Sequence, residues 1–575
     1  MKKVLKRILS YSKPYSLYLI LAITSALIGV LVSLFTPIFI GNAVDLIISK
    51  DNVDFIGLKN IAILITITIL ISVIFEWVMG VCSNHLAYKT VRDIRCELFA
   101  KLNEVPLKYI DGNSRGDLIS RAVNDIEILS VGLVQIFTQF FTGIVIIFGT
   151  LGFMLTINAN ITVVVVLITP LSLIVAAKIT KASYNAYKEQ SELRGDAGGY
   201  IEEMIGNQKV IKAFSYENRA EESFNKINDN LCETGIKATF YGSTTNPSTR
   251  FLNGLIFVAV GVVGALATIN GRLSVGQLSS FLTYSNQYTK PFNEISGVIA
   301  ELQNAIASAE RVFDVIDTPS ESSDKHLPEM VECNGRMEMK NVSFSYVPEL
   351  KLIKNFNLNV ESGQRIAIVG PTGCGKTTVI NLLLRFYDID SGEIIVSGKN
   401  INKITRDSLR SAYGMVLQET WLFSGSIAEN IAYGKTNATR EEIIEAARAV
   451  HAHGFIKRLP KGYDTIINED GGSLSQGQKQ LISIARIMLT NPPILILDEA
   501  TSSIDIRTEQ RIQRAFEKLM KNKTSFIIAH RLSTIQNADV ILVMNNGDII
   551  EQGNHNELIA MNGFYANLYT SQFSV

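Results

Sequence analysis

The segment GPTGCGKTT at 370–378 carries the residues best placed to do chemistry. It matches the phosphate-binding P-loop pattern G-x-x-x-x-G-K-[ST]. Backbone N–H groups of such a loop, together with the start of the helix that follows, attract phosphate anions. We expect Lys376 to reach the β- and γ-phosphates of a nucleoside triphosphate and the Thr377 hydroxyl to ligate Mg²⁺.

A second set of reactive side chains ends the apolar run ILILDE at 494–499. Asp498 is placed to organise Mg²⁺, as in P-loop enzymes that cleave nucleoside triphosphates. Glu499 is placed to polarise the attacking water, and a general base of this kind contributes about 10²–10⁴ in rate. Two acids at a strand end are more often only solvated, but the P-loop favours the catalytic reading.

Two buried strands must position these groups. RIAIVG at 365–370 is a short apolar run ending in glycine, which predicts a strand feeding the loop, and the helix-compatible TTVINLLLRFY follows. ILILD predicts the second strand.

The first part of the chain, ahead of these motifs, is dominated by apolar runs at 17–40, 61–81, 131–155, 161–177 and 251–269. Each is near the roughly 20 residues that cross a bilayer as a helix. The two long connections, 82–130 and 178–250, are rich in Lys and Arg, whereas 157–160 has no cation. The positive-inside rule therefore places both long loops and the amino terminus in the cytosol.

Five crossings would leave the P-loop outside the cell, so a sixth is required. Residues 278–302 are the candidate, despite their polar side chains. Such residues are tolerated where neighbouring helices shield them or where they line a wet cavity. Asn286, Gln287, Asn293 and Glu294 are therefore candidates to face that cavity.

The remaining segments bound the domains. We expect a cationic amphipathic helix at the membrane surface over residues 1–16 and the transmembrane domain over 17–314. A polar linker follows at 315–335, and the nucleotide-binding domain covers 336–575. Five cysteines without metal spacing predict reduced thiols. Zero net charge offers no signature of a nucleic-acid partner.

The sequence LSQGQ at 474–478 resembles the signature of ATP-binding-cassette (ABC) exporters, and the resemblance covers nearly the whole chain. It implies that Ser475 and Gly477 contact the γ-phosphate held by an opposite subunit, and that Tyr346 stacks on adenine. It further implies that Gln418 senses Mg²⁺, Asp505 crosses the dimer and His530 lies near the γ-phosphate. The nucleotide-contacting set is then Tyr346, Gly370, Pro371, Thr372, Gly373, Cys374, Gly375, Lys376, Thr377, Thr378, Gln418, Ser475, Gly477, Gln478 and Asp505, with Thr377, Gln418 and Asp498 around the metal and Glu499 and His530 catalytic.

Two cytosolic loops resemble those that carry coupling helices in these exporters, at 109–126 and 205–217. In the first, Arg121 and Asp125 are alternatively a plain surface ion pair, four residues apart on a helix. Gln476 departs from the usual LSGGQ, which leaves a homodimer and a heterodimer both open. Cys374 is either a small packing residue or a reactive thiol at a helix start.

The fold class expected is a six-helix all-α transmembrane domain with long cytosolic helix extensions, followed by an α/β P-loop domain. The resemblance implies ATP-driven export of hydrophobic or amphipathic compounds, such as drugs or lipids, across the plasma membrane. The cofactors are ATP and Mg²⁺, and the partner is an identical or paralogous half-transporter in the lipid bilayer. The alternative is an ATP-gated channel or membrane regulator; an importer or a soluble cassette ATPase fits the order and topology less well.

Overall fold

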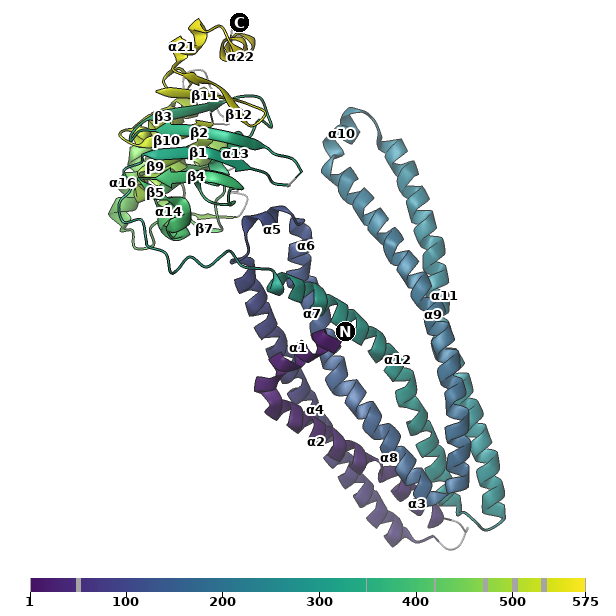
Figure 1. Cartoon of the computed structure of the whole chain (residues 1–575). Coiled ribbons are helices and arrows are strands. Elements are labelled where there is room, and N and C mark those ends of the chain that lie inside the picture. Colours follow the sequence, from purple (N-terminus) through teal and green to yellow (C-terminus); the bar gives the residue numbers. More distant parts are fainter. Residues whose placement is uncertain are drawn as a thin grey trace. The chain divides into compact units, whose positions relative to one another are not determined.

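The computed structural model describes residues 2–47, 53–347, 349–417, 420–468, 474–498, 505–528 and 535–573. The chain forms two compact units (Figure 1). The first comprises Met1–Glu104 and Asn113–Thr318, and the second Val105–Gly112 and Pro319–Val575. Residues 105–112 thus pack with the second unit, although the chain on both sides of them belongs to the first unit.

The first unit is all helical. Its elements are α1 (Lys2–Ser12), η1 (Lys13–Tyr15), α2 (Ser16–Ser33), α3 (Thr36–Asp45), α4 (Phe55–Leu102), α6 (Arg115–Ser120), η2 (Arg121–Asp125), α7 (Ile126–Gln135), η3 (Ile136–Phe140), α8 (Phe141–Ile157), α9 (Ala159–Gly206), α10 (Gln208–Ala213), α11 (Glu217–Ile269) and α12 (Val275–Asp317).

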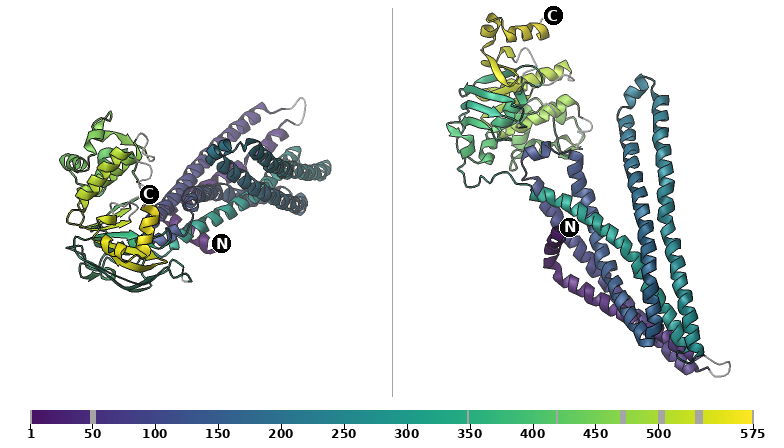
Figure 2. Two further views of the ribbon diagram at one scale, coloured as in Figure 1. Left: turned by 90° about the horizontal axis from the view of Figure 1, so that it is seen from above. Right: turned by 45° about the vertical axis from the view of Figure 1, so that its right-hand side comes forward.

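Among the described residues, four helical stretches are long and apolar enough to cross a membrane: Lys3–Asp45, Phe55–Leu102, Arg115–Ile157 and Arg250–Ile269. Ala159–Pro170 in α9 is a shorter apolar stretch. The weak sixth candidate lies in α12, a continuous helix that contains Pro291. The helices run well past the apolar segments, as α9 and α11 show by lying side by side up to α10 at their tip (Figures 1 and 2).

The ends of α3 and α12 approach each other very closely. A Cβ at Gly276 would overlap the carbonyl oxygen of Gly41, so this contact requires glycine. Asp45 caps α12 by accepting hydrogen bonds from the Ser274 hydroxyl (2.5 Å) and the Gly276 N–H (2.7 Å). The Ser280 hydroxyl donates to the Pro37 carbonyl at 2.7 Å. These contacts fix the register of the two helices.

The suggested Arg121–Asp125 ion pair is wrong. Arg121 instead forms an ion pair with Asp117 at 2.8 Å, one helical turn earlier in the chain. Asp125 is 1% exposed and pairs with Arg311 of α12. The π-helical turn η2 shifts residue positions relative to a regular α-helix, so that four-residue spacing no longer places side chains together.

The second unit is α/β. Its strands are β1 (Met337–Phe344), β2 (Ile353–Val360), β3 (Arg365–Val369), β4 (Ser391–Val396), β5 (Lys399–Asn400), β6 (Tyr413–Val416), β7 (Gly425–Ser426), β8 (Ile466–Ile467), β9 (Ile494–Asp498), β10 (Thr524–Ile528), β11 (Val540–Asn545) and β12 (Asp548–Gly553). Its helices are α5 (Leu107–Asp111), α13 (Lys376–Leu383), η4 (Ile401–Lys403), α14 (Arg406–Ser411), α15 (Ile427–Ala432), α16 (Arg440–Ala449), α17 (His453–Ile456), η5 (Gly462–Asp464), α18 (Gln476–Thr490), α19 (Ile506–Met520), α21 (His555–Ala560) and α22 (Phe564–Phe573).

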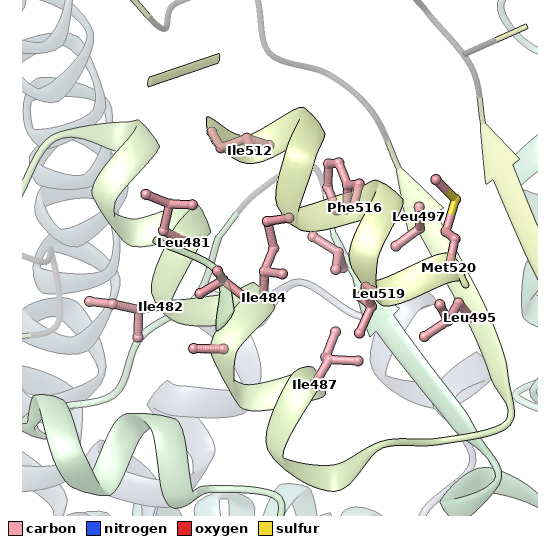
Figure 3. Close-up of a cluster of buried hydrophobic side chains, with 14 of the residues drawn as sticks. Leu481, Ile482, Ile484, Ile487, Leu495, Leu497, Ile512, Phe516, Leu519 and Met520 are labelled. Carbon is pink, nitrogen blue, oxygen red and sulfur yellow. The ribbon is translucent and has the colours of Figure 1, made fainter. Parts of the chain in front are cut away.

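Two main sheets organise this unit. The larger has the order β12-β11-β3-β10-β9-β6 and is parallel except for β12, while β2-β1-β4-β5 is antiparallel. One apolar core lies between the larger sheet and α18 and α19, with Leu481, Ile484 and Phe516 among its side chains (Figure 3). The other joins β1, β2 and β4 to α13 and the opposite face of β3. The strands carrying the two motifs are therefore held rigidly.

Candidate functional site

The P-loop lies between β3 and α13, as its sequence predicts. Gly370, Gly373 and Gly375 have φ of 155°, 84° and 102°, respectively. Glycine adopts such angles without the strain that a side chain would bring. The loop therefore presents backbone N–H groups to an anion at the start of α13.

Lys376 folds back over this loop. Its ammonium donates to the carbonyl oxygens of Gly370 at 2.9 Å and Pro371 at 3.0 Å. Thr377 is exposed at the beginning of α13, whereas Thr378 is buried. The ammonium is thus held over the loop, and Thr377 is open to solvent at the start of the helix.

Asp498 ends β9, and the P-loop follows β3 in the same parallel sheet. Carboxyl ends of parallel strands meet at one edge of a sheet, which is where ligands of open α/β sheets bind. A hydroxyl and a carboxylate are oxygen ligands of the kind that Mg²⁺ prefers. The donor types at this edge therefore fit the metal.

Tyr346 is held by its hydroxyl and by two aromatic neighbours. Its hydroxyl donates to Thr378 Oγ1 at 3.3 Å and accepts from the Asn381 side chain at 3.3 Å. Its ring meets those of Phe344 and Tyr387 edge-on, at centroid distances of 4.8 and 5.0 Å. The side chain is 36% exposed, which leaves surface available for a planar base.

Ser475 and Gln478 cap the start of α18 reciprocally. The Gln478 N–H donates to the Ser475 hydroxyl at 3.3 Å, and the Ser475 N–H donates to the Gln478 side chain at 3.0 Å. Gly477 is buried and Gln476 is exposed. The signature residues thus form a helix N-terminus that is available to an anion, with the side chain of Gln476 on its surface.

Asp505 has a local structural role. It caps α19 by accepting from the Thr508 N–H at 2.9 Å, and this hydrogen bond lowers the pKa of its carboxyl group. Gln418, Glu499 and His530 lie outside the described residues.

Cys374 is 3% exposed and belongs to the apolar core around β1 and β2. Its sulfur lies 3.9 Å from the Lys376 ammonium. Cys374 is therefore a small packing residue of this core. Whether alkylating the thiol blocks ATP binding stays a prediction, which undiminished binding after complete modification would rule out.

Comparisons with known proteins identify the family. Residues 19–292 match the ABC transporter transmembrane region, and 353–502 match the ABC transporter domain. The chain belongs to the ABC transporter family.

Two relatives and one solved structure are similar to this ABC transporter over most of its length. It is 43% identical to the fatty acid ABC transporter ATP-binding/permease protein of Mycobacterium bovis, over 90% of this chain and 82% of that protein. It is 34% identical to the ATP-dependent lipid A-core flippase of Desulfotalea psychrophila, over 99% of this chain and 100% of that one. A bacterial Atm1-family ABC exporter with ATP bound matches with a TM-score of 0.80 and 28% identity, over 97% and 98% of the two chains.

The protein is therefore a membrane-spanning ATPase of the exporter type, with a transmembrane domain followed by an ATP-binding domain. Export is driven by ATP through alternating access.

One contact of the transporter was not predicted residue by residue. The docking segment (Val105–Gly112), which lies between α4 and α6, packs on the nucleotide-binding domain. Leu107 packs against the core around β1 and β2, and Asp111 accepts a hydrogen bond from the Tyr387 hydroxyl. Burial raises the pKa of Tyr387, and the bond to Asp111 raises it further, so this hydroxyl is a donor at neutral pH. RFYD at 385–388 offered no local signal of this pairing.

The linker is also anchored by contacts that its sequence did not predict. Arg406 is 6% exposed and donates to the Ser322 carbonyl oxygen at 3.0 Å. Its backbone N–H donates to Asp324 at 2.6 Å, and its guanidinium lies 3.6 Å from Glu321. The Ser408 hydroxyl accepts from the Met330 N–H at 2.9 Å. The linker therefore follows the surface of the nucleotide-binding domain and is fixed at several points.

Proposed function

We propose that this ABC transporter exports lipid-like amphipathic compounds as one half of a homodimer or heterodimer. Relatives that are named for fatty acid transport and for lipid A-core flipping support this substrate class. The nucleotide-binding domain and the amino terminus face the cytoplasm of a cell whose plasma membrane holds the helices. The basic loops at 82–130 and 178–250 support this orientation.

The contact of Tyr387 with Asp111 is the observation that supports coupling of the nucleotide site to the membrane domain. It joins a segment of the membrane-domain loop to the same aromatic group that holds Tyr346 beside the P-loop helix. A change at the nucleotide can therefore be passed to the docking segment through packed side chains.

In the proposed cycle, two ATP molecules close two nucleotide-binding domains. The P-loop and Lys376 hold the phosphates of one nucleotide, and Ser475, Gly477 and Gln478 contact the γ-phosphate across the dimer. Tyr346 stacks on adenine. Closure shifts the membrane domains from inward-facing to outward-facing, as a population shift that ATP favours.

Thr377, Asp498 and Gln418 would hold Mg²⁺, which neutralises phosphate charge during phosphoryl transfer. Glu499 polarises the attacking water, with His530 near the γ-phosphate. Hydrolysis then resets the dimer. Asp505 is proposed to contact the partner subunit.

Reconstitution tests the function. Proteoliposomes containing the purified chain, with and without a co-expressed paralogous half-transporter, should accumulate labelled fatty acid or lipid against its gradient when ATP is supplied. A gated channel or membrane regulator would only equilibrate a permeant solute. Downhill flux alone would therefore favour the channel alternative and reject export.

A further inference from the structure

Helix α4 carries an exposed apolar stripe on the first unit. Leu70, Ile74, Trp77 and Val81 follow one another at intervals of three or four residues and share one helix face. Their exposed fractions are 57%, 58%, 69% and 44%, respectively. At 1.5 Å per residue the stripe is about 16 Å long, close to half of a ~30 Å hydrocarbon core.

The same face continues into a cavity of about 330 Å³, which is lined by Asn84, His85, Tyr88, Lys89 and Arg92. The aromatic ring of Tyr18, from α2, stacks on His85 at a centroid distance of 5.3 Å. The chemistry of this face therefore changes from apolar to aromatic and cationic within two helical turns.

The cationic groups differ in their partners. Arg92 donates to the Asp93 carboxylate at 2.7 and 3.0 Å, and the Tyr15 hydroxyl donates to the same carboxylate at 2.7 Å. Lys89 is half-buried, and in the part of the chain that the structure describes it makes no hydrogen bond or ion pair. The Asp93 carboxylate also attracts Lys89, so one negative charge faces two cations and the cluster keeps a net positive charge.

With the apolar stripe placed in the hydrocarbon core, the position of the cavity along the helix axis matches the level of the lipid headgroups. His85 lies about 6 Å and Lys89 about 12 Å beyond Val81 along the helix axis. The headgroup layer extends roughly 5–8 Å past the hydrocarbon on each side, and a long lysine side chain reaches back toward it. Beside α4, the amphipathic α1 exposes Leu5 and Leu9 and carries Lys3 and Lys6, as a helix at a membrane surface does.

We propose that this face of α4 binds an anionic phospholipid. Its phosphate lies at Lys89, with His85 and Arg92 beside it, and an acyl chain follows Leu70, Ile74, Trp77 and Val81. The lipid is a bound component of the membrane domain, and its binding is independent of the compound that is exported. A zwitterionic lipid carries a cation that opposes Lys89 and binds more weakly.

Binding of phosphatidylglycerol and phosphatidylcholine to the full, ATP-free chain in detergent tests this site, with bound lipid counted by native mass spectrometry. We expect Lys89→Gln to weaken phosphatidylglycerol binding about fivefold, because one cation near a lipid surface contributes about that factor. Phosphatidylcholine binding should not change, and Lys89→Arg should retain the preference for the anionic lipid. Lys59→Gln, at the opposite end of α4, is the matched control and should bind as the wild type does.

Three results would overturn the proposal. The first is equal binding of both lipids by the wild type. The second is an equal loss of binding in Lys59→Gln and Lys89→Gln. The third is dissociation of the dimer by Lys89→Gln without a change in lipid binding, which would assign this face to a partner subunit. Competition with soluble glycerol phosphate separates a lipid site from a free-phosphate site. If glycerol phosphate at equal concentration fails to displace the lipid, the site is a lipid site. Complete displacement would show that the site binds free phosphate.

Discussion

The Tyr387 hydroxyl donates a hydrogen bond to the Asp111 carboxylate, and through this bond the docking segment is held to the nucleotide-binding domain. Tyr387 also meets Tyr346 edge-on, and Tyr346 bonds Thr378 of the P-loop helix. Two side chains therefore separate the P-loop helix from the segment contributed by the membrane-domain loop.

Tyr387→Phe removes this hydrogen bond and keeps the ring. We expect ATP binding to remain within about twofold of wild type and the stimulation of ATPase activity by transported lipid to fall several-fold. A hydrogen bond to a charged group contributes about 1.5–3 kcal/mol. Tyr433→Phe, which alters an exposed tyrosine of the same domain, is the control. Unchanged lipid stimulation in Tyr387→Phe would remove this bond from the coupling path.

The raised pKa of Tyr387 sets a pH window for the same contact. A group whose pKa is raised on folding contributes stability that is complete below its ordinary value, near 10, and is lost as pH rises through the folded value. Lipid-stimulated ATPase activity should therefore show no loss from this contact between pH 7 and 9. A loss in that range that Tyr387→Phe abolishes would contradict the assignment.

Arg406→Leu should release the linker from the nucleotide-binding domain. Removing one partner of a buried charge network costs up to about 3–5 kcal/mol, and we expect less here because Glu321 and Asp324 are 28% and 21% exposed. Limited proteolysis should cut the variant within 318–330 at least tenfold faster than wild type. Lys403→Leu, on the neighbouring exposed turn, should be cut at the wild-type rate.

The linker contact also predicts an acid dependence. Burial raises the pKa of Asp324, but hydrogen bonding and charge from Arg406 outweigh burial, so its pKa is lowered. The stabilisation is present above the ordinary value, near 3.9, and is lost as pH falls through the lower folded value. Linker proteolysis at pH 5 that already matched Arg406→Leu would disagree with this sign.

Gly276→Ala should destabilise the membrane domain, because the new Cβ overlaps the Gly41 carbonyl. Overpacking costs typically about 1–3 kcal/mol, which predicts a lower Tm in detergent. Gly254→Ala, a helical glycine with open space around it, is the control and should leave the Tm unchanged. An equal Tm for both variants would argue against the close contact of α3 with α12.

Local sequence was sufficient for the fold and for much of the candidate site. Lys376 and Ser475 lie at helix starts because the P-loop and the capping pattern are local signals. Tyr387–Asp111, Arg406–Asp324 and Asp125–Arg311 join residues far apart in the chain, and no local pattern encodes such pairs. Asp125 was misassigned because a π-helical turn changes the spacing that a regular helix would give.

The most direct test of the account measures ATP turnover and labelled-lipid translocation in the same proteoliposomes. We predict that translocation requires ATP, and that Glu499→Gln binds ATP but loses about 10²–10⁴ of the hydrolysis rate together with sustained translocation. Continued uphill translocation by Glu499→Gln at the wild-type rate would contradict the claim that hydrolysis in this domain drives the membrane helices.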